Sequence, residues 1–95
     1  MLRITRTDHR NHILISIEGK LVGDNIEVAE LTCGEALATN TPVTVFLKEI
    51  TGIDANGHAF LRRLVMARVR LRALGIYSRY IVRKLLLSKS QPDQL

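Results

Sequence analysis

The sequence predicts an α/β fold in which a mixed sheet of about four to five strands is covered mainly on one face by about three helices. Two observations lead to this prediction. Segments with alternating or continuous apolar residues, typical of strands, are separated by segments with apolar residues at helical spacing. Their order along the chain is strand, strand, helix, strand, helix, strand, helix, which implies parallel strand pairs joined by right-handed helical crossovers.

The first two predicted strands form a hairpin. Residues 2–6 and 13–18 alternate between apolar and polar side chains. The polar segment 7–12 between them is typical of a turn. We therefore expect the two strands to lie side by side and antiparallel.

A helix follows the hairpin. Residues 23–25, Gly-Asp-Asn, interrupt the strand pattern and supply an N-cap. The helix is expected to end near Ala38, because residues 39–42 close with a proline. Its apolar face consists of Ile26, Ala29, Cys33, Ala36 and Leu37.

A second strand and helix repeat this arrangement. The apolar run 43–47 predicts a buried strand, and Asp54 occupies the position of a helix N-cap, where its carboxylate accepts hydrogen bonds from the free N–H groups of the first turn. The helix is expected to run to about Ala67. Its apolar positions are Phe60, Leu61, Leu64 and Val65.

The last strand, Val69 to Leu74, alternates apolar residues with Arg70 and Arg72, so we place it at or near the edge of the sheet. After Gly75, residues 76–87 predict a terminal helix. The residues expected to line one side of it are Tyr77, Tyr80, Ile81 and Leu85. Residues 1–87 are thus expected to form a single domain, with 88–95 as a flexible C-terminal tail.

Composition supports a single folded domain in a reducing compartment. The 95 residues are 46% hydrophobic, enough for one core. The one cysteine, Cys33, has no partner for an internal disulfide and reads as a small core residue. Met1 leads directly into a charged strand, so we expect no signal peptide, and no apolar run approaches the roughly 20 residues of a membrane span. We therefore expect a cytoplasmic protein.

The segment Ile53-Asp54-Ala55-Asn56-Gly57 resembles a motif of the STAS domains, the family of the anti-sigma factor antagonists. In that family a central strand runs into a hydrophobic-Asp-Ser/Thr-Ser-Gly motif that begins a helix. Residues 19–21 resemble the family's turn after the second strand, and Val69 to Leu74 resemble the strand after the motif helix. The resemblance covers roughly residues 2 to 87 and implies a STAS-like fold.

The chain departs from the family at the residues that carry regulation. Asn56 matches the phosphorylated serine of the motif and has no hydroxyl, and Ala55 removes the other hydroxyl. Phe46 and Val22 stand where the family often has acidic residues. The resemblance therefore implies a STAS-like domain without the usual phosphorylation switch.

Charge is distributed unevenly along the chain. Residues 1–54 carry five basic and eight acidic side chains, whereas residues 55–95 carry nine basic and one acidic. The basic residues of the second half form a solvated face, a docking surface for an acidic protein, or a surface for nucleic acid or anionic lipid, in that order of preference. We do not expect nucleic acid as the partner, because no helix-turn-helix spacing, zinc-ligand set or paired aromatic platform is present.

No pattern indicates an enzyme or a cofactor site. His9 and His12 lie in a predicted turn with Asp8, but no fourth ligand completes a metal site. No serine or cysteine has a nearby base in sequence, and no glycine-rich phosphate loop is present. We expect no catalytic residue, metal or cofactor.

We expect the chain to bind a protein partner around the Asp54 helix start. The resemblance implies an anti-sigma factor or related regulator as that partner. The expected contact residues are Asp54, Ala55, Asn56, Gly57, His58, Leu61 and Arg62. Two alternatives stay open: nucleotide or anion sensing at the same helix N-terminus, and a role as a small cytoplasmic subunit of a lipid transport complex. Homodimerisation also stays open.

Overall fold

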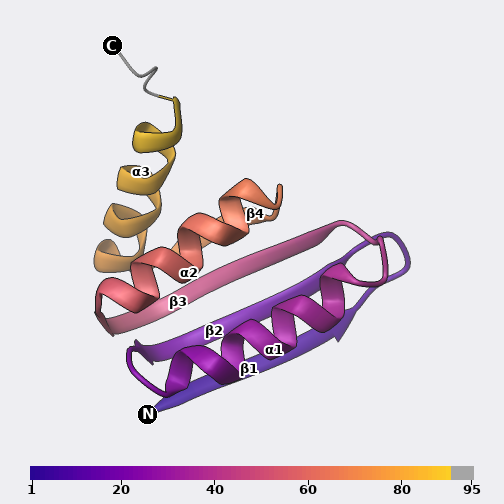
Figure 1. Cartoon of the computed structure of the whole chain (residues 1–95), viewed down its shortest axis with the longest axis horizontal. Helices are drawn as coiled ribbons and strands as arrows, with labels where there is room; N and C mark the ends of the chain where they lie inside the picture. Colours follow the sequence, from indigo (N-terminus) through magenta and orange to yellow (C-terminus); the bar gives the residue numbers. More distant parts are fainter. Residues whose placement is uncertain (91–95) are drawn as a thin grey trace.

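A computed structural model describes residues 1–90, with side chains as far as residue 87. Four strands form one mixed sheet, and three helices pack on it, which confirms the predicted α/β class (Figure 1). The elements in chain order are β1 (Leu2–Asp8), β2 (Ile13–Leu21), α1 (Asn25–Leu37), β3 (Val43–Ile53), α2 (Ala55–Met66), β4 (Arg70–Leu74) and α3 (Ile76–Ser90).

The strands lie in the order β1-β2-β3-β4. The first pair is the predicted antiparallel hairpin, and β2, β3 and β4 run parallel to one another. The connections through α1 and α2 step across the sheet in the same direction, so their common handedness places both helices on one face. In Figure 1, α1 lies over β1 and β2, and α2 lies along β3. As predicted, β4 is an edge strand.

The core lies between this face of the sheet and the helices. Every second residue from Ile13 to Ile17 in β2 and from Val43 to Leu47 in β3 is buried. The helices contribute Ile26, Ala29, Cys33, Ala36, Phe60, Leu61, Leu64, Ile81, Val82 and Leu85. Removal of this apolar surface from water is the main force that holds the layers together.

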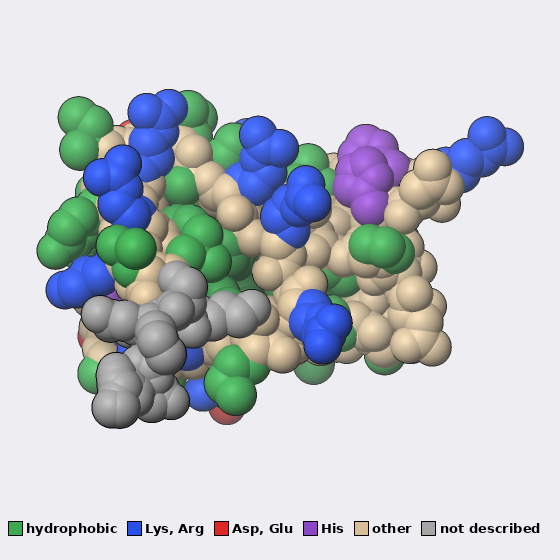
Figure 2. All heavy atoms as spheres, turned by 90° about the horizontal axis from the view of Figure 1, so that it is seen from above, with side chains coloured by type: hydrophobic (Ala, Val, Ile, Leu, Met, Phe, Trp, Pro, Cys, Tyr) green, Lys and Arg blue, Asp and Glu red, His purple; other side chains and the backbone are tan. Residues whose placement is uncertain are grey.

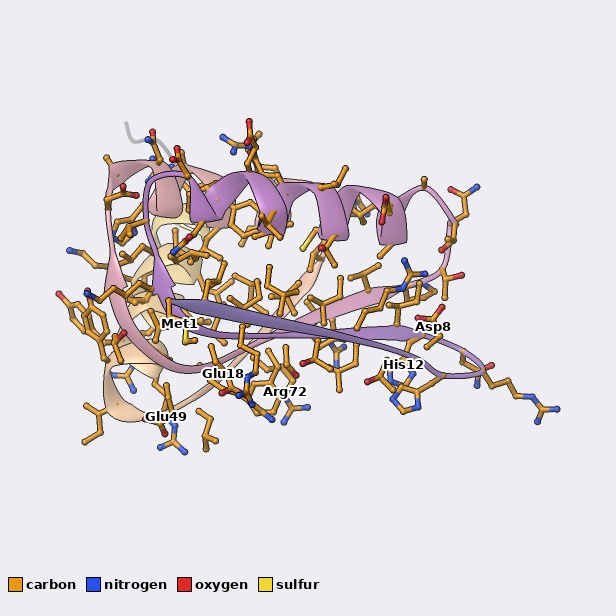
Figure 3. The ribbon with its side chains drawn as sticks, turned by 90° about the horizontal axis from the view of Figure 1, so that it is seen from below. Met1, Asp8, His12, Glu18, Glu49 and Arg72 are labelled. Atoms are coloured by element: carbon orange, nitrogen blue, oxygen red, sulfur yellow. The ribbon has the colours of Figure 1, made fainter. Side chains whose placement is uncertain are left out.

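The other face of the sheet, which we call the open face, carries no helix. Figure 3 shows Glu18 and Arg72 on the side of the sheet opposite α1. None of its residues on the three parallel strands is buried, in contrast to most of those on the helix-covered face. Its residues on the three parallel strands are Leu14, Ser16, Glu18, Thr44, Phe46, Lys48, Arg70, Arg72 and Leu74.

Two irregularities in the strands were not predicted. Gly19 has a φ of 104° and lies opposite a register shift in which Glu49 and Thr51 of β3 have no partner in β2. Residues 19–21 continue the strand rather than form a turn. Glu49 has a φ of 48° and lies in the second half of β3, which extends to Ile53. The backbone N–H of Ile50, next to this kink, donates a hydrogen bond of 3.0 Å to the buried hydroxyl of Ser78. The kink thereby connects β3 to α3.

The terminal helix α3 differs from the prediction in its buried face and in the position of its C-terminal end. Tyr77 and Tyr80 are exposed, and the buried face consists of Ser78, Ile81, Val82 and Leu85. The helix continues to Ser90, so the predicted tail 88–95 begins as helix, while residues 91–95 lie outside the described residues. Within residues 1–90, no helix is long and apolar enough to cross a membrane.

The burial of Cys33 predicts a thiol that is inert in the folded chain. Its side chain is 1% exposed, and burial raises its pKa to about 11, so little reactive thiolate exists at neutral pH. A disulfide-based thiol reagent should label the native chain very slowly and the denaturant-unfolded chain at once. The absorbance of the released reagent group measures the labelling rate. Rapid labelling of the native chain would contradict the packing of α1 described above.

Candidate functional site

Asp54 begins α2, as the sequence predicts. Its backbone is extended, and its carboxylate oxygen Oδ1 accepts a hydrogen bond of 2.8 Å from the backbone N–H of Gly57. Its carbonyl oxygen accepts the first helical hydrogen bond, from the N–H of His58 at 3.0 Å. The predicted N-cap is therefore confirmed.

The same carboxylate also binds a second loop. Its other oxygen, Oδ2, accepts a hydrogen bond of 2.9 Å from the backbone N–H of Gly23, in the connection between β2 and α1. The backbone N–H of Asp54 in turn donates to the carbonyl of Leu21 at 3.4 Å. One side chain thus connects the starts of two helices, which the sequence pattern did not indicate.

These hydrogen bonds perturb the acidity of Asp54. The N–H groups of Gly23 and then Gly57 lower the pKa of the carboxyl, because they stabilise its ionised form. A carboxyl with a lowered pKa in the folded state stabilises that state above its unfolded pKa of about 3.9. That contribution is lost as the pH falls through the lowered folded pKa.

Two of the expected contact residues, Gly57 and Leu61, are buried and hold α2 in place. Gly57 is buried, and a Cβ at this position would overlap the carbonyl oxygen of Leu21 and lie 2.7 Å from Cγ1 of Ile53. Leu61 is fully buried in the core. Both residues fix the position of α2, and neither presents a side chain that a partner could reach in the folded chain.

The exposed residues of the expected surface lie on two sides of α2. On one side, Asn56 borders a hollow of about 260 Å³ between α1 and α2. Arg63 lies in the same hollow and forms an ion pair with Glu30 of α1. The acidic residues along this hollow are Asp24, which precedes α1, and Glu27 and Glu30 of α1. This groove is therefore predominantly acidic.

On the other side, His58 and Arg62 line a second hollow of about 260 Å³, between α2 and α3. Lys84 supplies a further basic side chain, and Ile81 and Leu85 form the apolar floor. The exposed start of α2, with Ala55 and Asn56 at its tip, is thus a ridge between an acidic and a basic groove. The packing of α2 beside α1 and α3, as in the ion pair of Arg63 with Glu30 33 positions earlier, could not be predicted from local spacing.

The remaining chemical candidates form no site. The rings of His9 and His12 stack at 4.6 Å, and Asp8 pairs with Arg6 rather than with either histidine. Among residues 1–90, no group of three His, Cys, Asp or Glu side chains is placed to hold a metal ion.

Comparison of the chain with models of protein families and with curated proteins gives no match.

Gly57→Ala should lower the free energy of unfolding by about 1–3 kcal/mol, because the new methyl group overlaps the backbone of the neighbouring loop. Gly34→Ala is the matched control: Gly34 lies in α1 with no atom near its missing Cβ, so alanine should stabilise the helix by about 0.5–1 kcal/mol. Urea denaturation of both variants measures the contrast. Equal effects would contradict the close approach at Gly57.

Asp54 variants should lose stability in steps. Asn retains one acceptor oxygen and Ala none, so at pH 7 we expect the melting temperature to fall from the native chain to Asp54→Asn and further to Asp54→Ala. The gap between the native chain and Asp54→Asn should narrow as the pH drops below about 3.9, where the native carboxyl loses its advantage. Calorimetry at several pH values measures this, and a gap that does not change with pH would contradict it.

Proposed function

We propose that the chain is a non-catalytic, STAS-like regulatory or adaptor domain that binds a protein partner on the ridge at the start of α2. The observation that supports this most is the double hydrogen bond of the Asp54 carboxylate, to Gly23 and to Gly57. It holds the two helix starts together and leaves Ala55 and Asn56 exposed on a fixed backbone. A preorganised exposed surface binds a partner with a smaller entropic penalty than a mobile one.

The charges beside the ridge suit a partner that presents both acidic and basic side chains. The basic groove of His58, Arg62 and Lys84 complements acidic side chains, and the acidic groove between α1 and α2 complements basic ones. By the resemblance to STAS domains, an anti-sigma factor or related regulator is the proposed partner. Since Asn56 carries no hydroxyl, binding would proceed without a phosphorylation switch.

The same geometry argues against an anion sensor at this helix start. The N–H of Gly57, which would face a bound phosphate, already donates to Asp54, and so does the N–H of Gly23. The ionised carboxylate would also repel an anion. Protein binding is therefore the better-supported reading of the ridge.

Capture of partners from a cell lysate by the tagged chain, with identification by mass spectrometry, tests the proposal. We expect a regulator that the native chain retains and that Asn56→Asp and Arg62→Glu lose. The first variant adds a charge that mimics a phosphoserine next to the acidic groove, and the second reverses a charge in the basic groove. Arg10→Glu, an exposed change in the β1–β2 turn, is the control and should retain the partner.

Retention of the partner by both ridge variants would contradict the proposal. So would capture of no protein by the native chain under conditions where it is folded.

A further inference from the structure

The edge strand β4 is unpaired on its outer side. Within the described residues it pairs only with β3, and the sheet order places it last. An unpaired edge presents a row of backbone N–H and C=O groups to which an extended segment can add as a further strand. The side chains on the two faces of β4 then decide which segment fits.

The open-face side of β4 is strongly basic. Arg68, Arg70 and Arg72, which we call the arginine row, line a hollow of about 710 Å³ whose floor includes Leu14 and Phe46. No acidic side chain lines this hollow. Among the described side chains, residues 1–87, the ion pairs are Arg6 with Asp8 and Arg63 with Glu30, and neither includes a residue of the arginine row. Figure 2, seen from the α3 and β4 side, shows Lys and Arg side chains gathered here with few Asp or Glu.

Arg68 holds a backbone position at which glycine is usual. It follows the C-cap of α2, and the N–H of Val69 donates to the carbonyl of Leu64 while its own N–H donates to Val65. This hydrogen-bond pattern requires a left-handed residue, and Arg68 has a φ of 67°. Arginine is strained there relative to glycine, which suggests that its side chain, at the mouth of the hollow, serves a purpose other than folding.

The helix side of β4 is mainly apolar. Leu71 and Ala73 alternate with the arginines and, with Val82 of α3, line a hollow of about 430 Å³ beneath the edge. Arg79 and Arg83 of α3 also border this hollow. A strand added to β4 would therefore meet positive charge on one face and apolar surface on the other, with the strand period of two residues.

We propose that β4 docks an extended segment of a partner protein in which acidic and apolar residues alternate. The acidic residues face the arginine row, the apolar ones face Leu71 and Ala73, and backbone hydrogen bonds complete the pairing. The β4 strand of a second copy does not fit this edge, because pairing β4 with β4 brings arginines of the same face together. The hollow beside the arginine row begins near the C-terminal end of α2, about 18 Å from the Asp54 ridge, so this is a separate surface from the one proposed above.

A fluorescent peptide of about seven residues in which Glu and Val alternate is the probe, since this is a usual strand length. We expect it to bind the full chain, as read by fluorescence anisotropy, and to shift and protect β4 amide signals in NMR spectra. A peptide of the same composition with its Glu and Val residues grouped is the control and should bind at least about tenfold more weakly.

Charge exchange tests the register. The double variant Arg70→Glu/Arg72→Glu should bind the acidic peptide at least about tenfold more weakly and should gain binding to a peptide in which Lys and Val alternate. Arg3→Glu, an exposed change on the opposite edge strand β1, should leave the affinity unchanged. Arg68→Gly separates the effect on binding from the effect on stability. It should raise the melting temperature of the chain and at the same time weaken the binding of the acidic peptide.

Equal binding of the alternating and grouped peptides would overturn the proposal, since it would show charge attraction without strand addition. If neither peptide binds, the proposal is also wrong, and the arginine row serves only to prevent association of the β4 edge with other strands. Tighter binding of a single-stranded oligonucleotide than of the peptide would assign the row to phosphate recognition instead.

Discussion

The carboxylate of Asp54 is the interaction on which the exposed end of this domain depends. It accepts hydrogen bonds from Gly23, in the loop before α1, and from Gly57, in the first turn of α2, which are 31 and 3 residues away in the sequence. Each parallel strand of this fold delivers the chain to a helix start whose N–H groups lack partners. The ionised side chain of Asp54 accepts a hydrogen bond from one of these groups, the N–H of Gly57, and another from the N–H of Gly23 just before α1, so it joins the two helix starts. Burial of Gly57 against the Leu21 carbonyl then leaves the α2 start little freedom to shift.

A second constraint follows from the one-sided cover of the sheet. Because both crossovers place their helices on the same face, the chain retains an open sheet face and an edge strand in addition to its helical surface. The molecule therefore has two separate places where a partner could dock. The ridge at the start of α2 is bordered by grooves of opposite charge, whereas the β4 edge is basic on the open-face side and mainly apolar on the helix side, where Arg79 and Arg83 border the apolar surface.

The sequence was informative where the physics is local. Helical and strand periodicity predicted every element, and the Asp54 to Gly57 hydrogen bond lies within one turn. The Gly23 hydrogen bond and the Arg63 pair with Glu30 join residues more than 30 positions apart, and no spacing rule reaches that far. The same periodicity that predicted α2 assigns Leu61 to the core, so its burial could have been foreseen. The positive φ of Gly19 and the bulge of β3 at Glu49 depend on strand pairing that only the folded sheet shows.

The most direct test of the account is an NMR titration that follows the Asp54 carboxyl carbon together with the amide protons of Gly23 and Gly57. The account predicts that the carboxyl titrates below the ordinary Asp value of about 3.9 and that both amide protons shift with the same midpoint. An ordinary pKa, or an amide of Gly23 that does not follow the carboxyl, would show that Asp54 does not join the two loops.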